Sequence, residues 1–247
     1  NKKYMLGADP SRGDSGDFHG MHILEEHTLD EVVEYKGKCP TIQFANIIAE
    51  YSEKYNKAVV TVENNGVGWA VIQELVRIGN INLVHTHNQK VIIDPHKTKQ
   101  DLAGGKTVPG FSMTSNSRLN ALESLQKFIN EEDFKIKSKR LLSELKTFAY
   151  VNGKPQAMDN SCHDDLVLSL AQLLYVYEVY ILSQERNKAR IKAISGALSR
   201  SSVNNTNSNI KSSTENKVSP EKQKMIDKHF KQKIDKYTEI DIRDFLR

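Results

Sequence analysis

The sequence predicts an α/β domain built on a mixed β-sheet flanked by helices. Three closely spaced strand patterns open the chain, which is typical of an antiparallel meander. A helical pattern follows, and then the β-branched run Ala58-Val-Val-Thr-Val62, which is typical of a strand buried on both faces. The order of three strands, helix, strand, helix and strand therefore predicts a sheet with both antiparallel and parallel neighbours.

The first strand is predicted to run from Tyr4 to Asp9, because a short apolar stretch ends there at a cluster of turn residues, 10–16. The second and third strands are predicted at 18–25 and 31–38. This arrangement places the Asp9 carboxylate at a rigid strand end beside an open, glycine-containing turn, where a hard cation and a phosphate both have access. Alternatively, Asp9 and the nearby aspartates are turn formers.

The remaining elements follow from apolar spacing and turn chemistry. Residues 87–114 lack a strong pattern and read as a long loop, a feature that is usually functional or mobile. A hairpin over 148–158 is predicted from Asn152-Gly153. Helices are expected at 42–51 (with Thr41 as a possible cap), 69–78, 116–130, 138–147 and 166–182, with a fifth strand at 82–86.

The domain boundaries are predicted from shifts in composition. Residues 1–185 carry the periodic patterns of a folded domain, 186–218 contain a Ser/Asn-rich flexible linker, and 219–247 form a small helical tail. The chain begins without an initiator Met or a signal-peptide pattern, and we expect it to be the C-terminal portion of a longer protein.

Net charge, cysteine content and the length of apolar runs bear on the partners and the cellular setting of the protein. The net charge of +4 and the pI near 8.8 permit a polyanionic partner without requiring one. The two cysteines, Cys39 and Cys162, match no zinc spacing, and a reduced intracellular setting is expected. No apolar run approaching the ~18 residues of a membrane helix is evident in the sequence.

Acidic residues fall at the ends of three predicted elements. Asp9 ends the first strand, Glu63 ends the buried strand, and Asp164-Asp165 opens the last helix. In a mixed sheet of this order, the first and fourth strands are neighbours and the helix packs over them, so these acids converge. Like-charge repulsion in such a cluster is usually relieved by a divalent metal. Two Mg²⁺ or Mn²⁺ ions there are suited to phosphodiester hydrolysis.

Three short segments together resemble the acidic motifs in the nuclease domain of large terminase subunits from tailed bacteriophages, nearest the T-even-like branch. They are Asp9-Pro-Ser-Arg-Gly with Asp17-Phe-His, Val62-Glu63-Asn-Asn-Gly66, and His163-Asp164-Asp165-Leu-Val-Leu-Ser-Leu170. The resemblance covers about residues 4–182. It implies an RNase H-like fold and a metal-dependent endonuclease that cuts concatemeric double-stranded DNA during genome packaging.

The resemblance assigns metal-binding and catalytic roles to Asp9, to Glu63 and to one of Asp164 and Asp165, with Asp17 at the margin of the metal site. Helical periodicity slightly favours Asp164 over Asp165, because Asp164 shares a face with apolar residues. His163 is a candidate for assisting the attacking water, although a histidine in this position is often structural.

Basic residues in or beside the long loop are candidates for DNA contacts, because neutralising phosphates gives affinity that is independent of sequence. These candidates are Lys97, Lys99, Lys106, Arg118, Lys137, Lys139 and Arg140. The resemblance also implies portal protein and the small terminase subunit as partners, and the host cytoplasm as location during virus assembly. No P-loop pattern occurs in the chain, so we expect the ATPase motor in another part of the intact protein.

Two alternatives to this function remain open at the level of sequence. The chain is compatible with another RNase H-like nuclease, such as a junction resolvase or an RNA-strand hydrolase. It is also compatible with a module that chiefly docks on portal protein and cleaves weakly. Preference for four-way junctions, or portal binding that is independent of Glu63, would distinguish these alternatives.

Overall fold

The structure is a computed structural model of the 247-residue chain, and it describes residues 2–13, 16–87, 90–92, 107–131, 133–151, 154–159, 161–182 and 192. The predicted linker at 186–218 contains only one of these residues, and the predicted tail at 219–247 contains none. Both therefore remain predictions.

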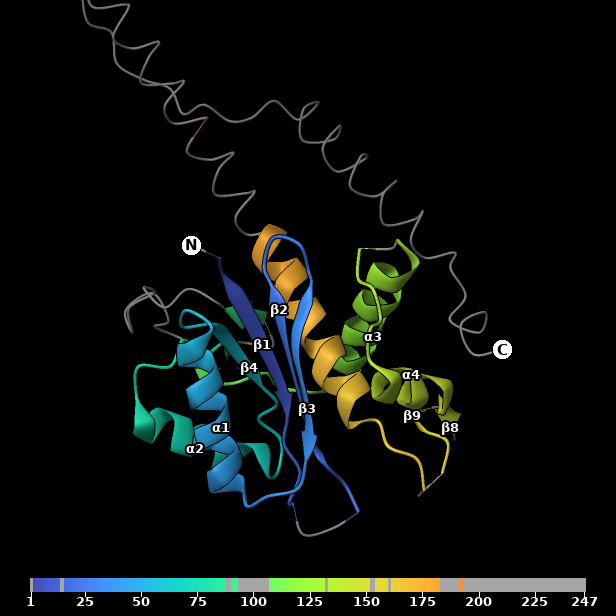
Figure 1. Cartoon of the computed structure of the whole chain (residues 1–247), viewed down its shortest axis with the longest axis horizontal. Coiled ribbons are helices and arrows are strands. Elements are labelled where there is room, and N and C mark those ends of the chain that lie inside the picture. The colour runs from blue at the N-terminus through green and yellow to red at the C-terminus, as the bar shows by residue number, and fades with distance from the viewer. Residues whose placement is uncertain are drawn as a thin grey trace, which may run out of the picture. The chain divides into compact units, whose positions relative to one another are not determined.

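A four-stranded mixed sheet forms the centre of the fold (Figure 1). Its strand order is β3-β2-β1-β4, with β1 antiparallel to β2 and parallel to β4, and β2 antiparallel to β3. This order confirms the predicted meander and the predicted pairing of the first and fourth strands. The strands are β1 (Tyr4–Asp9), β2 (His19–Glu25), β3 (Glu31–Gly37) and β4 (Val59–Val62).

Helices cover both faces of this sheet (Figure 1). On one face, α1 and α2 pack on a core that includes Leu6, Met21 and Val62. On the other, α3, α4 and a long helix pack on a second core that includes Met5 and Leu24. The helices are α1 (Thr41–Lys54), α2 (Gly68–Ile78), α3 (Ser115–Asn130), α4 (Lys139–Lys146) and the long helix (Asp165–Leu182).

Part of the predicted long loop is a small antiparallel sheet. β5 (His85–His87) pairs with β6 (Lys90–Ile92) and with β7 (Thr107–Pro109), so the expectation of a loop over all of 87–114 was wrong at β6 and β7. These strands are only three residues long, too short to show a period in the sequence. The predicted hairpin is confirmed as β8 (Phe148–Val151) paired with β9 (Lys154–Ala157).

The expectation that no apolar run approaches the length of a membrane helix was wrong for the long helix. Its 18 residues have a mean hydropathy of 1.5, which satisfies the length and composition of a membrane span. In the structure, however, 61% of this window is buried within the protein, where Leu166, Leu170 and Leu173 belong to the core. A helix buried on most sides needs this composition without any membrane.

Two glycines allow the long helix to lie close to the sheet. A Cβ atom at Gly7 would stand 2.6 Å from the Ser169 carbonyl oxygen and from Leu173 Cβ. A Cβ atom at Gly20 would stand 2.4 Å from the carbonyl oxygen of Asp165. Both strands therefore contact the first turns of the helix through backbone, and no side chain fits between them.

We expect Gly20→Ala to destabilise the fold by about 1–3 kcal/mol, because the added methyl group must push the helix start away from β2. Urea unfolding followed by circular dichroism measures this change. Gly16→Ala is the matched control, since a Cβ atom there meets nothing within 4 Å. Equal stability of the two variants would contradict the close approach.

Candidate active site

Asp9 and Glu63 lie side by side at one end of the sheet. Ala8 and Val62 are partners in the parallel pairing of β1 with β4, and the Glu63 N–H donates to the Ala8 carbonyl oxygen at 3.2 Å. Ala8 and Val62 point into the core under α1 and α2. Because side chains alternate along a strand, the next residues, Asp9 and Glu63, point to the opposite face, toward the long helix.

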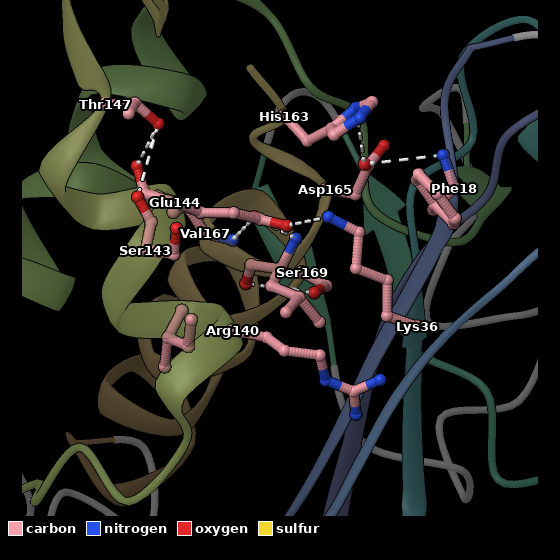
Figure 2. A network of polar contacts seen from close by, with 12 residues as sticks. Phe18, Lys36, Arg140, Ser143, Glu144, Thr147, His163, Asp165, Val167 and Ser169 are labelled. Carbon is pink, nitrogen blue, oxygen red and sulfur yellow. Dashed lines mark hydrogen bonds and ion pairs between the residues drawn. The ribbon is translucent and has the colours of Figure 1, made fainter. Parts of the chain in front are cut away.

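The start of the long helix brings two more carboxylates to this end of the sheet. Asp164 precedes the helix, and its carbonyl oxygen accepts from the Leu168 N–H at 2.9 Å. Its carboxylate accepts from Arg118 Nη2 at 3.2 Å. Asp165 is buried, and its Oδ2 accepts from the Phe18 N–H at 3.4 Å (Figure 2). The two aspartates therefore have different partners: Asp164 contacts α3, and Asp165 contacts the residue before β2.

The pKa of Asp9 is held well above its usual range, first by burial and then by the charges of Glu63, Asp165 and Asp164, with Arg118 opposing the shift. The predicted convergence is therefore visible in the electrostatics of one side chain. We call Asp9, Glu63, Asp164 and Asp165 the acidic quartet.

Two other members of the acidic quartet also resist ionisation. Burial raises the pKa of Glu63, and Arg118 opposes the rise. Burial raises the pKa of Asp165 to about 7, with a further contribution from the charge of Glu144. The quartet is thus a site where adding a cation lowers the free energy, because the carboxylates repel one another in a poorly solvated place.

The acidic quartet fits divalent cations by donor type and by charge. Carboxylate oxygens are the ligands that Mg²⁺ and Mn²⁺ prefer. No three residues of the quartet, all of which are described, bring ligand atoms within 4.8 Å of one another. In the metal-free chain, the Asp164 carboxylate is engaged in its ion pair with Arg118. We therefore expect cation binding to draw the carboxylates together.

Glu144 on α4 holds the start of the long helix in place (Figure 2). Its Oε2 accepts from the N–H groups of Leu166 and Val167, at 2.8 and 3.3 Å. Its Oε1 forms an ion pair with Lys36 of β3. A buried carboxylate thus satisfies the free N–H groups of the first helical turn and complements the helix dipole.

Sequence reasoning missed Glu144 and Lys36. Glu144 lies in a short helix, Lys139–Lys146, and nothing in its spacing separates it from a surface glutamate. Its burial, with 5% of the side chain exposed, becomes apparent only when α4 packs against the long helix.

His163 and Asp17 occupy the surroundings of the acidic quartet. The His163 ring packs edge-on against Phe18 at 5.0 Å, and its Nδ1 is 3.8 Å from Asp165 Oδ2 (Figure 2). That nitrogen has no hydrogen-bond partner among the described residues. Asp17 is exposed in the turn between β1 and β2, where its carbonyl oxygen accepts from Ser11 Oγ at 3.3 Å. The predicted roles of both residues stay predictions.

The predicted DNA-contacting residues have different surroundings in the structure. Arg118 lies at the acidic quartet, where it also donates to the Pro155 carbonyl oxygen. Lys137 pairs with Asp30 at 2.7 Å, and Arg140 pairs with Glu34 at 2.7 Å. Lys139 is exposed at the first position of α4. Lys97, Lys99 and Lys106 lie outside the described residues.

We expect the metal-free chain to lose stability as the pH rises from about 4 to about 7. The folded state keeps the Asp165 proton up to about pH 7, whereas the unfolded carboxyl, with its ordinary value of 3.8, releases it earlier. In this range the folded state binds more protons, so raising the pH favours unfolding. Asp165→Asn removes this contribution, which is on the order of 4 kcal/mol. Urea unfolding in EDTA at pH 4 and pH 8 measures it.

The control for this prediction is Glu53→Gln, because Glu53 is exposed on α1, on the opposite face of the sheet. It is expected to keep the pH dependence of the original chain. A pH dependence that is the same in the Asp165→Asn variant would contradict the assignment to Asp165.

We expect Glu144→Gln to destabilise the fold by about 1–2 kcal/mol, since a neutral amide replaces the charged acceptor of two helix N–H groups. Chemical unfolding measures the change, and Glu123→Gln, at an exposed position of α3, is the control. If both variants unfold at the same urea concentration, Glu144 does not stabilise the helix start.

The solved structures that this chain resembles include large terminase nucleases of phages. The chain is similar to the large terminase nuclease from thermophilic phage G20c, at 22% identity and a TM-score of 0.53, over 70% of this chain and 81% of that one. Structures of that nuclease with bound magnesium and with bound cobalt align over the same shares, each at 20% identity and a TM-score of 0.53.

No protein-family model matches the sequence. The similarity to the G20c nuclease concerns the arrangement of a mixed sheet between two layers of helices, which was the fold expected from the sequence. This chain therefore has the RNase H-like fold of a large terminase nuclease domain.

Proposed function

We propose that this chain is a metal-dependent endodeoxyribonuclease domain that cleaves concatemeric double-stranded viral DNA during genome packaging. The observation that carries the proposal is the position of the acidic quartet at one end of the sheet, where the pairing of β1 with β4 sets Asp9 beside Glu63. The raised pKa of Asp9, caused by burial and then by the charges of Glu63, Asp165 and Asp164, agrees with this position. The similarity in fold to the G20c large terminase nuclease supports it. That nuclease has been solved with bound magnesium, which supports a divalent cation here.

In this proposal, Asp9, Glu63 and one of Asp164 and Asp165 would hold two Mg²⁺ or Mn²⁺ ions. Such ions would lower the pKa of a bound water and would stabilise the charge that develops on the phosphodiester. Asp9 and Glu63 are held by rigid backbone, because Asp9 is the last paired residue of β1 and Glu63 directly follows β4. The helix start contributes the remaining carboxylate, at a position that Glu144 holds.

Arg118 and His163, beside the acidic quartet, have proposed roles in phosphate binding and in proton transfer. Arg118 pairs with Asp164 in the metal-free chain, and its guanidinium would be available to a DNA phosphate if a cation took its place at Asp164. His163 presents an Nδ1 without a hydrogen-bond partner among the described residues, 3.8 Å from Asp165. It is therefore proposed to orient the attacking water or to accept its proton.

DNA is the proposed partner, and the basic residues of the long loop and α4 are its proposed phosphate contacts. Portal protein and the small terminase subunit are proposed as further partners from the resemblance in the three acidic segments. The proposed place of action is the host cytoplasm during virus assembly. The packaging ATPase is proposed to lie in another part of the intact protein.

Cleavage of supercoiled and linear plasmid with Mn²⁺, Mg²⁺ or EDTA tests the activity. We expect metal-dependent degradation, and we expect Glu63→Gln to lower its rate on the order of 100-fold or more, because each ion supplies several kcal/mol of transition-state stabilisation. Glu53→Gln, an exposed acid on the other side of the sheet, is expected to cut at the original rate.

The proposal fails if cleavage persists in EDTA, or if the folded Glu63→Gln variant cuts like the original chain. A four-way junction cut in preference to linear duplex would indicate a resolvase instead. Absence of cleavage by the folded chain with every metal, together with binding to portal protein, would indicate a docking module.

A further inference from the structure

A second group of potential metal ligands lies between β2 and β3, and it shares no residue with the acidic quartet. The ring of His22 and the carboxylates of Glu31 and Glu34 bring one ligand atom each within 4.8 Å of one another. The three side chains are 0%, 6% and 9% exposed. Two acidic groups are rarely buried together without charge compensation.

A β-bulge places these three residues on one face of the sheet. His22 is directly opposite Glu34 in the pairing of β2 with β3. Glu31 is three positions before Glu34, and in a regular strand it would point to the other face. The register shifts at Ile23 and Leu24, whose partners are Val33 and Glu31, so Val32 is the extra residue. The bulge therefore turns Glu31 to the side of His22 and Glu34.

The hydrogen bonds of His22 leave one nitrogen for a ligand. Its Nε2 is 3.0 Å from the Leu166 carbonyl oxygen, which can only accept, so Nε2 carries a proton. Its Nδ1 is 2.5 Å from Glu31 Oε1, and one proton is shared between these two atoms. Donation of one ring N–H to a backbone carbonyl is the usual second contact of a metal-binding histidine, because it fixes the orientation of the ring.

Glu34 supplies an independent observation. Its Oε1 accepts from Nε and Nη2 of Arg140, at 2.8 and 2.7 Å. Its Oε2 is buried and has no hydrogen-bond partner among the described residues. A buried carboxylate oxygen without a partner is costly, and an ion at this position would satisfy it.

We propose that His22 Nδ1, Glu31 and Glu34 bind a transition-metal dication such as Zn²⁺. One nitrogen and two carboxylate oxygens form a donor set that suits Zn²⁺, with water as a fourth ligand. Mg²⁺ fits this site less well, because it keeps several waters and these side chains are nearly buried. Binding releases the proton shared by His22 and Glu31, and Nδ1 and Oε1 separate by roughly 1 Å to admit the ion.

The bound ion would join the edge strand β3 to β2 and, through His22, to the start of the long helix. β3 is at the edge of the four-stranded sheet, and among the described strands it pairs only with β2. His22 contacts the Leu166 carbonyl oxygen, one residue after Asp165. The proposed site is therefore structural, and it stabilises the same helix start that Glu144 holds.

The test uses the full chain carrying Asp9→Asn and Glu63→Gln, so that the acidic quartet does not compete for metal. We expect the chain to bind one equivalent of Zn²⁺ in equilibrium dialysis. We also expect bound Zn²⁺ to raise the midpoint of thermal unfolding by about 4–8 °C. Mg²⁺ at the same concentration is expected to leave the midpoint unchanged. Because the background lacks two quartet acids, failure of the nuclease proposal does not affect this result.

Adding Glu34→Gln to that chain is expected to abolish both the bound equivalent and the thermal shift, whereas adding Glu53→Gln is expected to abolish neither. Glu31→Gln is the second variant if Glu34→Gln does not fold. Anomalous diffraction at the zinc edge is expected to place the ion at His22 Nδ1. Absence of bound Zn²⁺, retention of Zn²⁺ in the folded Glu34→Gln or Glu31→Gln variant, or an anomalous peak elsewhere would overturn the proposal.

Discussion

Repulsion among the four carboxylates of the acidic quartet is the constraint on which the rest of this structure depends. Asp9, Glu63 and Asp165 all have raised pKa values, and burial is the largest cause for each. The neighbouring backbone therefore has to be stable enough to hold these charges together.

That backbone comes from strand pairing and from a helix seated directly on the sheet. The β1–β4 pairing places Asp9 beside Glu63, while Gly7 and Gly20 let the long helix approach without intervening side chains. Glu144 then satisfies the N–H groups at the helix start from a third element, α4. Each of these contacts stabilises the fold, and together they offset the repulsion that the site introduces.

The buried negative charge is compensated differently in the two acidic clusters. In the group of His22, Glu31 and Glu34, a shared proton and Arg140 compensate much of the charge. In the acidic quartet, Arg118 pairs with Asp164, and the carboxyls of Asp9 and Asp165 tend to stay protonated. Buried carboxylates commonly bind protons when no metal is present and release them when a divalent cation binds. Both clusters have carboxylate oxygens that suit such an exchange.

The sequence by itself determined the mixed sheet, most of the helices and the three segments that carry the acidic quartet, because these follow from local periodicity and from strand order. It did not determine β6 and β7, which are too short to show a period. The burial of Glu144, the placement of Arg118 at Asp164, and the bulge that turns Glu31 toward His22 were decided only by tertiary structure. Each depends on contacts between residues far apart in the chain or on a local shift in register, and neither leaves a pattern in the sequence.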